Sequence, residues 1–363
     1  MRMTVLASGS KGNSTVVATA DTRILVDAGL SCRELRKRMA AAGEDPCALS
    51  AILITHEHQD HVAGLATMAR RLRIPVYFTE PTHRAWVRMV TPRSTMTYAE
   101  WLAHVQREKE LRAAQTAASE CTTPHSQESV ILSEVVPPSG TAQSKDPEGV
   151  HAASGDRTVL PEVKTTVTLN AAASDPDEDE IAETEPEAAK PDPSFLPAVQ
   201  YFSAGASFTI GDIAVTPFTI PHDAADPCGF VFESRTENVR MAVATDLGYV
   251  PPNVKAALRR MDVILLESNH DLEMLRDGPY PWSVKQRVLS RVGHLSNHAA
   301  AEFLSRDYDG GAQYIVLGHL SEQNNDPSLA LLAAEQAIDG RMSLLGNRIV
   351  LAEQSTPLRP ITL

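Results

Sequence analysis

The chain has 363 residues, of which 43% are hydrophobic and 22% charged, and its formal net charge is -13. This length allows one large domain or two with a sizeable buried core, and the composition is ordinary for a soluble globular protein. The sequence shows no signal peptide and no apolar stretch long enough to span a membrane, which predicts a cytoplasmic protein. Cys32, Cys47, Cys121 and Cys228 lack Cys-x-x-Cys spacing, which disfavours a disulfide framework and a thiolate zinc site.

The negative charge is concentrated in one part of the chain. Residues 103–197 carry 18 acidic and 7 basic side chains, whereas the rest carries 28 acidic and 26 basic ones. The remainder is nearly neutral and contains basic clusters at residues 33–38 and 70–73. Such clusters can follow a phosphate backbone, and they can equally be solvated helix faces.

The beginning of the chain predicts three strands, over Thr4–Ala7, Thr15–Ala18 and Ile24–Asp27. The loop Ser8–Ser14 between the first two does not have the residue order of a phosphate-binding loop, and no helix follows it. We interpret it as a tight hairpin that supports a site, with contact to a substrate phosphate as the alternative. Ser31 is placed to cap a basic helix that follows it.

The most informative segment covers residues 55–61, Thr-His-Glu-His-Gln-Asp-His, directly after the apolar strand Ala51–Ile54. His56 and His58 leave the strand two residues apart, on one side of an extended backbone, so both can reach one ion. Asp60 and His61 begin an apolar-periodic run that predicts a helix, and they are placed to bind a second ion. Exposed helix starts also gather such residues without binding metal, but four potential ligands within six residues favour a metal site.

This His-x-His-x-Asp-His pattern after a buried strand resembles the signature of the metallo-β-lactamase superfamily. The resemblance implies an α/β (α+β) fold, the αββα sandwich of that superfamily, with one or two metal ions at the strand ends. The pattern alone does not distinguish among the hydrolases, nucleases and redox proteins of the superfamily.

The next part of the chain predicts a strand over Pro75–Phe78 and helices over Pro81–Met89 and Tyr98–Ala118. Beyond these, Ser, Thr, Pro, Ala and Glu dominate, and such a composition cannot bury enough apolar surface to order itself. We therefore predict residues 1–115 as the N-terminal half of a metallo-β-lactamase domain, 116–197 as a long, disordered, acidic low-complexity insertion, and 198–363 as the C-terminal half of the same domain. A tolerated solvated loop is favoured over an insertion that mimics or repels nucleic acid.

The C-terminal half predicts strands that end in polar side chains. Strands are expected over Ala206–Ile210, Ala214–Ile220, Gly229–Glu233, Arg240–Thr245, Val263–Glu267 and Tyr314–Leu317, and helices over Asn253–Arg260, Ser283–Val292 and Ser296–Leu304. Three of these strands run into His222, Asp246 and His319, just as an earlier strand runs into His56. Each residue alone could be structural, but together they predict ligands that converge on one edge of a sheet pair.

The superfamily resemblance distributes these residues over two metal ions. It implies that His56, His58 and His222 hold the first ion, that Asp60, His61 and His319 hold the second, and that Asp246 bridges both. Imidazole and carboxylate ligands suit Zn²⁺, with Mn²⁺ as the alternative. Two divalent ions about 3.5–4 Å apart would share a bridging hydroxide and clamp the attacking and leaving oxygens of an in-line hydrolysis.

Further segments resemble the YycJ/WalJ branch of the superfamily, which is related to RNase Z. They are Pro221-His222-Asp223-Ala224, Thr245-Asp246-Leu247-Gly248, Glu267-Ser268-Asn269-His270-Asp271, Gly293-His294-Leu295-Ser296-Asn297 and residues 318–325. Outside the predicted insertion, the resemblance covers nearly the whole chain. It implies a phosphodiesterase with 5′-to-3′ exonuclease action and nucleic acid as its partner, DNA rather than RNA.

The same resemblance implies Asp60, Asp246 and His294 as catalytic residues. His294 would lie near the scissile phosphate and stabilise charge or protonate the leaving oxygen, since an imidazole exchanges protons near pH 7. A helix-capping histidine is the alternative for His294. His270 would support a ligand or touch substrate, and Asp27 is implied only as a supporting residue.

Two other hypotheses compete with a nuclease. The first is a small-molecule hydrolase of the same fold that cleaves a thioester, a lactone or a lactam. The second is a metal-dependent binding or redox module, but a di-iron redox member usually replaces one histidine of the motif by a carboxylate, and here His58 is retained. The sequence leaves open the identity of the metal, the strand polarity, the role of the insertion and the oligomeric state, with a dimer as one option.

Overall fold

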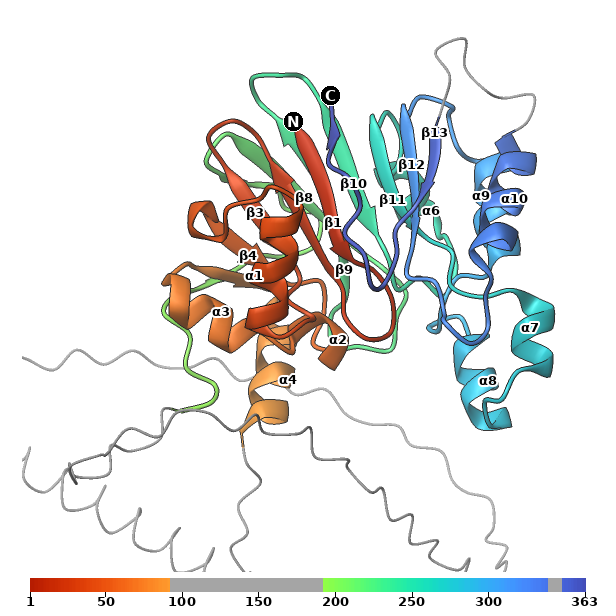
Figure 1. The fold of residues 1–363 in the computed structure, drawn as a ribbon, viewed down its shortest axis with the longest axis horizontal. Coiled ribbons are helices and arrows are strands. Elements are labelled where there is room, and N and C mark those ends of the chain that lie inside the picture. Colours follow the sequence, from red (N-terminus) through yellow and green to blue (C-terminus); the bar gives the residue numbers. More distant parts are fainter. Residues whose placement is uncertain (92–191, 339–347) are drawn as a thin grey trace, which may run out of the picture. The chain divides into compact units, whose positions relative to one another are not determined.

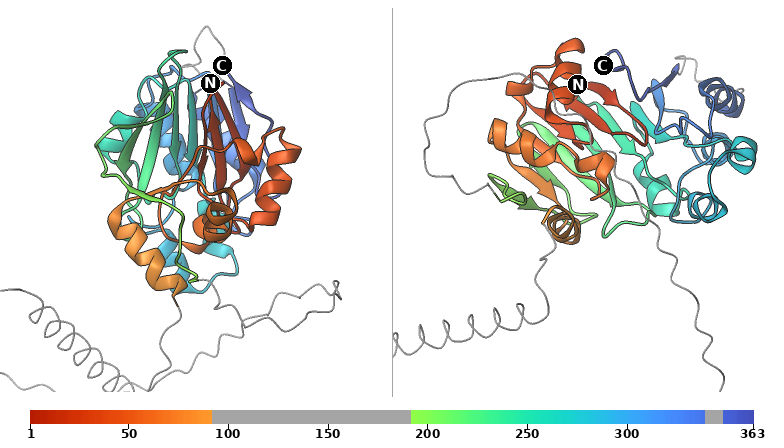
Figure 2. Two further views of the ribbon diagram at one scale, coloured as in Figure 1. Left: turned by 90° about the vertical axis from the view of Figure 1, so that its left-hand side faces the viewer. Right: turned by 60° about the horizontal axis from the view of Figure 1, so that its bottom comes forward.

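Two seven-stranded sheets pack face to face in the computed structural model, with helices on their outer sides (Figures 1 and 2). The structure describes residues 1–91, 192–338 and 348–363. Most of the predicted insertion, residues 116–191, lies outside these ranges, as does the predicted helix Tyr98–Ala118. The chain is described again from Asp192, and Leu196 already packs in the hydrophobic core of the first sheet.

The first sheet is formed mainly by the N-terminal part of the chain, in the order β14-β1-β2-β3-β4-β5-β6. Its strands are β1 (Arg2–Ala7), β2 (Ser14–Ala18), β3 (Arg23–Val26), β4 (Ala51–Leu53), β5 (Val76–Phe78), β6 (Val199–Tyr201) and β14 (Ile361–Thr362). The strands β3 to β6 are parallel neighbours, so their carboxyl ends lie at one edge of the sheet. The short strands β6 and β14 were not predicted from the sequence.

The second sheet is formed by the C-terminal part, in the order β13-β12-β11-β10-β9-β8-β7. Its strands are β7 (Phe208–Ile210), β8 (Ile213–Thr219), β9 (Cys228–Ser234), β10 (Arg240–Ala244), β11 (Val263–Glu267), β12 (Tyr314–Gly318) and β13 (Arg348–Leu351). The strands β10 to β13 are parallel, and β8 shares their direction because it is antiparallel to β9. The carboxyl ends of β8, β10, β11 and β12 therefore share one edge.

The helices cover the outer faces and one end of the sheet pair (Figure 1). They are α1 (Cys32–Ala41), α2 (Gln59–Val62), α3 (Leu65–Leu72), α4 (Glu80–Val90), α6 (Pro252–Ala257), α7 (Leu272–Asp277), α8 (Trp282–Val288), α9 (Asn297–Arg306) and α10 (Pro327–Ile338), with a short 3-10 turn at Pro46–Ala48. Ser31 caps α1 as predicted, because its side chain accepts a hydrogen bond from the Glu34 amide. Among the helices in these ranges, none is both long and apolar enough for a bilayer crossing.

Two predicted helices differ from the observed ones. The run after the metal motif forms α2 and α3 rather than one helix, because Gly64 lies against another loop: its amide donates to the Ala28 carbonyl at 2.8 Å, and a Cβ there would lie 2.1 Å from the Leu30 carbonyl oxygen. The helix predicted over Ser283–Val292 ends at Val288. There the chain turns, since the His294 amide donates to the Val288 carbonyl at 2.9 Å.

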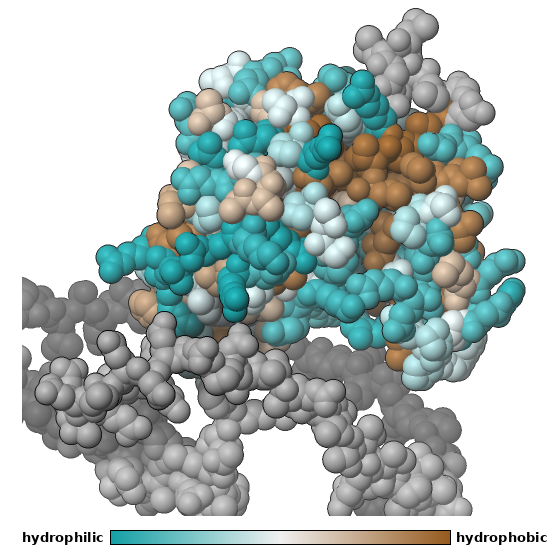
Figure 3. Space-filling view, in the orientation of Figure 1, coloured by the Kyte–Doolittle hydropathy of each residue, from teal (hydrophilic) through white to brown (hydrophobic). Residues whose placement is uncertain are grey.

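Three hydrophobic cores hold the layers together and confirm the predicted αββα sandwich. Along β10, Met241 and Val243 pack between the two sheets, whereas Ala242 and Ala244 pack under the helices of the second sheet. The third core joins the first sheet to α1, α3 and α4. This alternation follows from the two-residue period of a strand that is buried on both faces. On the outside, Figure 3 shows a mostly hydrophilic surface with an apolar area over β12 and β13.

Candidate metal centre

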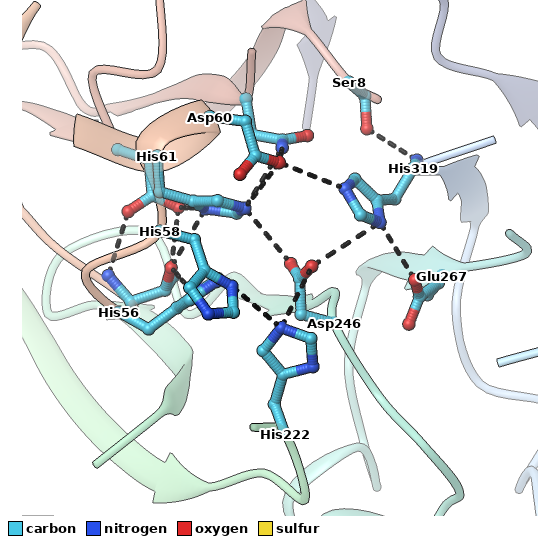
Figure 4. A network of polar contacts seen from close by, with 12 residues as sticks. Ser8, His56, His58, Asp60, His61, His222, Asp246, Glu267 and His319 are labelled. Atoms are coloured by element: carbon cyan, nitrogen blue, oxygen red, sulfur yellow. Dashed lines mark hydrogen bonds and ion pairs between the residues drawn. The ribbon is translucent and has the colours of Figure 1, made fainter. Parts of the chain in front are cut away.

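All seven predicted metal ligands lie together where the carboxyl ends of strands from both sheets meet (Figure 4). His56, His58, Asp60 and His61 lie between β4 and the end of α2, while the other three ligands follow β8, β10 and β12. Ligand atoms lie within 4.8 Å of one another in the groups His56/His58/His222, Asp60/His61/His319 and His56/His61/Asp246. The first two groups contain the residues predicted for the two ions, and a fourth group, Asp246/Glu267/His294/His319, lies within the same distance. Metal binding by these residues stays a prediction.

Three of the residues that follow strands have an unusual backbone conformation. Asp27, Asp246 and His319 have φ angles of 59°, 62° and 57°, in the left-handed region that residues other than glycine rarely adopt. Each such residue costs on the order of 1–3 kcal/mol, and the conformation persists only because the surrounding structure holds it. Here the conformation ends the strand abruptly and turns each side chain toward the centre.

In the first group, hydrogen bonds to Nδ1 leave the Nε2 atoms of two histidines directed at the centre. His56 Nδ1 lies 3.0 Å from Thr55 Oγ1, and His222 Nδ1 lies 3.2 Å from the Gly293 carbonyl oxygen. The Nε2 atoms of His56 and His222 lie 3.1 and 3.2 Å from His58 Nδ1. Three ring nitrogens thus converge on one point, which suits a cation shared between their lone pairs.

The second group repeats this arrangement with carboxylate partners. Asp27 Oδ2 lies 2.8 Å from His61 Nδ1, and Glu267 Oε1 lies 2.9 Å from His319 Nδ1. The Nε2 atoms of His61 and His319 lie 3.5 and 3.7 Å from Asp60 Oδ2. A carboxylate on the far nitrogen fixes the tautomer and orientation of a metal-binding histidine. Asp27 thus occupies the supporting position that the resemblance implied.

Burial and mutual charge shift the proton equilibria of the group. Burial lowers the pKa of His56, and the neighbouring imidazoles lower it further. Burial also opposes the charged form of His61 and of His319, but the surrounding carboxylates, Asp246 first among them, together outweigh burial and raise both pKa values. For Asp60, the adjacent imidazoles overcome burial and hold the pKa far below its usual range. The lowered pKa values of Asp60 and Asp246 favour ionised carboxylates that attract cations, and metal binding would displace protons from imidazoles.

Two buried atoms of the group are consistent with a metal site. Asp246 Oδ2 and His319 Nε2 are buried without a hydrogen-bond partner within the described residues. Burying such atoms is unfavourable unless a proton, a water molecule or an ion satisfies them. Imidazole and carboxylate donors without a thiolate match Zn²⁺ and Mn²⁺.

The loop after β1 supports the second group. Asn13 Nδ2 donates to Asp60 Oδ2 at 3.1 Å, and Ser8 Oγ accepts a hydrogen bond from the His319 amide at 2.7 Å. The loops pack so closely that a Cβ on Gly29 would lie 1.7 Å from the Asp60 carbonyl oxygen. The contacts fit the interpretation of this loop as a hairpin that supports the site. The sequence alone did not single out Asn13.

Glu267 is the principal site residue that the sequence analysis missed. Its carboxylate is fully buried and lies 2.8 Å from His294 Nδ1 in addition to its contact with His319. It also accepts hydrogen bonds from the Leu247 and Leu295 amides. The available signal was its position as the last residue of β11, since the ligand Asp246 likewise lies at the end of a strand.

His294 lies beside the centre. Its Nδ1 lies 3.8 Å from Asp246 Oδ1, and it lines a cavity of about 340 Å³ that also borders His58, Asp60 and His319. Burial lowers the pKa of His294, but the charge and hydrogen bond of Glu267, together with the charge of Asp246, outweigh burial and raise it. Ser296, not His294, caps α9 by accepting a hydrogen bond from the Ala299 amide. The capping alternative for His294 is therefore not supported.

His270 is buried, with 1% of its surface exposed, and neither ring nitrogen has a hydrogen-bond partner within the described residues. The structure shows no hydrogen bond from its ring to a predicted ligand. Burial lowers the pKa of His270 to about 4. Between about pH 4 and pH 6.5, the folded protein therefore keeps this imidazole neutral, whereas the unfolded chain binds a proton there.

This difference predicts a pH-dependent loss of stability. The contribution of His270 is fully present above about pH 6.5, the ordinary histidine pKa, and is lost as the pH falls toward 4. In that window we expect wild type to lose up to about 1.4 kcal/mol of unfolding free energy per pH unit more than His270→Leu. Urea unfolding at pH 4.5, 5.5 and 6.5 in EDTA measures this difference in unfolding free energy. The control is His298→Leu, since His298 is exposed. Parallel pH profiles for wild type and His270→Leu would contradict this assignment.

The comparisons with known proteins agree with this fold. Residues 7–96 match the family model of the metallo-beta-lactamase superfamily, and residues 155–319 match that of the beta-lactamase superfamily domain. The matched segments are metallo-beta-lactamase superfamily domains, and as an enzyme the protein is a metal-dependent hydrolase.

Individual relatives are similar along most of the chain. The exodeoxyribonuclease YycJ of Bacillus anthracis is 29% identical over 339 residues, which cover 93% of this chain and 89% of the relative. The exodeoxyribonuclease WalJ of Streptococcus pneumoniae is 28% identical over 329 residues, with coverages of 91% and 85%. The metallo-beta-lactamase fold protein YhfI from Bacillus subtilis superposes with a TM-score of 0.52 at 10% identity, over 99% of both chains, and supports the fold alone.

Proposed function

We propose that this protein is a two-metal phosphodiesterase, specifically a 5′-to-3′ DNA exonuclease that works in the cytoplasm. The observation that carries the proposal is a full set of converging imidazole and carboxylate donors in a chain that is similar, over 93% of its length, to a relative named as an exodeoxyribonuclease. Cys32, Cys47 and Cys228 are free thiols, which is consistent with a reducing compartment.

Each proposed ion has three ligands of its own. His56, His58 and His222 would hold one ion, Asp60, His61 and His319 the other, and Asp246 would lie between them. When bound, the divalent ions would act as Lewis acids on the phosphodiester and make water a strong nucleophile at neutral pH. The protein positions these donors through contacts to ligand Nδ1 atoms: Asp27, Gly293 and Glu267 each contact one ligand, and Thr55 contacts both His56 and His61.

His294 is the proposed proton donor. Its Nδ1 is held at 2.8 Å from Glu267 Oε1, which leaves Nε2 as the nitrogen available to substrate. His294 borders the cavity between the ligands and α8, where the leaving oxygen of a bound phosphodiester would lie. A hydrogen bond to a carboxylate orients the ring for proton transfer.

The proposal is tested with full-length protein, Mn²⁺ or Zn²⁺, and duplex DNA labelled at either end. A 5′-to-3′ exonuclease releases the 5′ label at once as a short product, whereas a 3′ label stays on progressively shorter strands. His56→Ala is expected to abolish both reactions while the far-UV circular dichroism spectrum stays unchanged. The matched control is His298→Ala, since His298 is exposed and lies outside the metal-binding groups.

Other products would refute specific parts of the proposal. Hydrolysis of thioester, lactone or lactam substrates without any cleavage of DNA would contradict the nuclease function. Cleavage of RNA but not DNA would contradict DNA as the proposed substrate. Early release of the 3′ label would contradict the proposed 5′-to-3′ polarity.

A further inference from the structure

One wall of the cavity beside the metal centre carries a positive charge that the proposed chemistry does not use. Helix α8 contributes Val284, Arg287 and Val288 to this wall, and their spacing places them on one helix face. Arg287 is the one lysine or arginine that lines the cavity within the described residues. A cavity of about 340 Å³ is at the lower end of small-ligand pockets, so the rest of a longer substrate must lie outside it.

The guanidinium of Arg287 is held in place but only partly engaged. Its Nε donates to Asp223 Oδ2 at 2.5 Å, and the Arg287 side chain is 64% exposed. Within the described ranges, this guanidinium forms no other hydrogen bond, which leaves both terminal nitrogens available. A planar guanidinium can bind a phosphate through two parallel N–H donors. Arg287 is therefore oriented by Asp223 and still able to bind an anion at the edge of the cavity.

A second guanidinium lies close by in the chain and is stacked on an aromatic ring. Arg291 Cζ lies 4.5 Å from the ring centroid of Tyr249. Tyr249 comes three residues after Asp246, and Arg291 comes three residues before His294. The two segments pack tightly, since a Cβ added to Gly248 would lie 2.1 Å from the Arg291 carbonyl oxygen. The stacked pair is thus attached to the segments that bring a predicted ligand and the proposed proton donor into the site.

The charge pattern of this region differs from that of the whole chain. Although the net charge of the protein is -13, the 24 residues from 278 to 301 contain three basic residues and no acidic residue. One of the three, Lys285, is buried and donates from Nζ to the Arg276 carbonyl at 2.6 Å. The exposed positive charges are those of Arg287 and Arg291. This surface suits a polyanion that continues outward from the cavity.

We propose that Arg287, Arg291 and Tyr249 bind a single-stranded stretch of nucleic acid that leads into the cavity. The two guanidiniums contact phosphates next to the scissile one, and the stacked Tyr249–Arg291 pair offers a surface for an unpaired base. Bases of single strands stack on aromatic rings and guanidinium planes, which a paired duplex does not offer. The inference rests on the proposed phosphodiesterase function and adds the form in which the substrate reaches the site, as an unpaired stretch of one strand that is longer than the cavity itself.

Binding of uncleavable strands tests this inference on the full-length protein loaded with Mn²⁺. The probes are a fluorescent twelve-nucleotide oligothymidylate with phosphorothioate linkages, which keep the charge but resist hydrolysis, and the corresponding dinucleotide. Arg287→Gln and Arg291→Gln should each weaken binding of the twelve-mer about tenfold, because each removes a charged hydrogen bond. Each should also reduce the slope of log affinity against log salt by about 0.7, the value for one phosphate contact on a single strand.

Further variants separate this role from general effects. Tyr249→Leu should weaken the twelve-mer about tenfold with little change in the salt slope, as expected for lost stacking. Arg306→Gln is the matched control, since Arg306 is an exposed arginine of α9 paired with Glu302, and it should leave affinity and slope unchanged. Circular dichroism shows whether each variant is folded, and the exposed Arg291 provides a test independent of the Asp223–Arg287 pair.

Several results would overturn the inference. Affinities and salt slopes equal to those of wild type in both arginine variants would contradict it, and so would tighter binding of a duplex than of the single strand. If wild type cleaves DNA but the variants bind normally, only this inference fails. If wild type binds the twelve-mer through these residues but cleaves no phosphodiester, the proposed function fails and the binding surface remains.

Discussion

Asp246→Asn is expected to abolish phosphodiester cleavage and to reduce the metal content of the protein. The carboxylate of Asp246 is 2% exposed and lies between the two groups of histidines, with Oδ2 3.4 Å from His61 Nε2 and Oδ1 3.9 Å from His222 Nε2. The amide removes the negative charge that both proposed ions share. Metal ions supply several kcal/mol of transition-state stabilisation, so we expect a loss of at least about a thousandfold in kcat/KM.

The asparagine variant isolates charge from backbone effects. Position 246 has a φ of 62°, and asparagine is one of the few residues that tolerate this left-handed conformation. The fold should therefore persist, as circular dichroism and thermal unfolding in EDTA would show. The matched control is Asp307→Asn, which removes a surface carboxylate paired with Lys255. Wild-type metal content together with wild-type turnover in Asp246→Asn would rule out a bridging role for this residue.

The sequence was informative about elements whose pattern is local. The continuous apolar runs of β10 and β11 predict strands, and Ser31 predicts the start of α1, because these signals depend only on neighbouring residues. Helix α10 was missed because its apolar residues lie on several sides: Ala334 is buried whereas Leu329 and Leu332 are exposed. Strand β14 was missed because only pairing with β1, at the opposite end of the chain, makes two residues a strand.

The residues of the candidate site also fall into some that could be predicted from the sequence and others that could not. The histidines and aspartates after strands could be found because ligand chemistry restricts the residue types, and because parallel strands bring their carboxyl ends together. The partners of those ligands could not be found by such reasoning, and Asp27 was implied only by the superfamily resemblance. Asn13 and Glu267 reach their targets only through the packing of loops and the register of β11 with β12, which no local pattern specifies. Supporting residues are determined by tertiary structure, whereas ligands are also recognisable by their chemistry.

Glu267→Gln is expected to weaken the binding of one proposed metal ion more than that of the other. Glu267 Oε1 contacts His319 Nδ1 and His294 Nδ1, and the structure shows no hydrogen bond from it to His56, His58 or His222. An uncharged amide orients the His319 ring less strongly and lowers its basicity. Replacing such a supporting carboxylate typically costs about 10–100-fold in metal affinity or activity. The loss should fall on the ion held by Asp60, His61 and His319, and nuclease activity should fall with it.

Zinc titration of metal-free protein by isothermal calorimetry distinguishes this positioning role from a general loss of structure. A positioning role predicts one site weakened and the His56/His58/His222 site unchanged, whereas a loosened fold would weaken both and lower the thermal midpoint in EDTA. Glu233→Gln is the control, because Glu233 lies on β9 with its side chain 51% exposed and paired with Arg240. Equal weakening of both ions would show that Glu267 acts on the scaffold of the site and not specifically on His319.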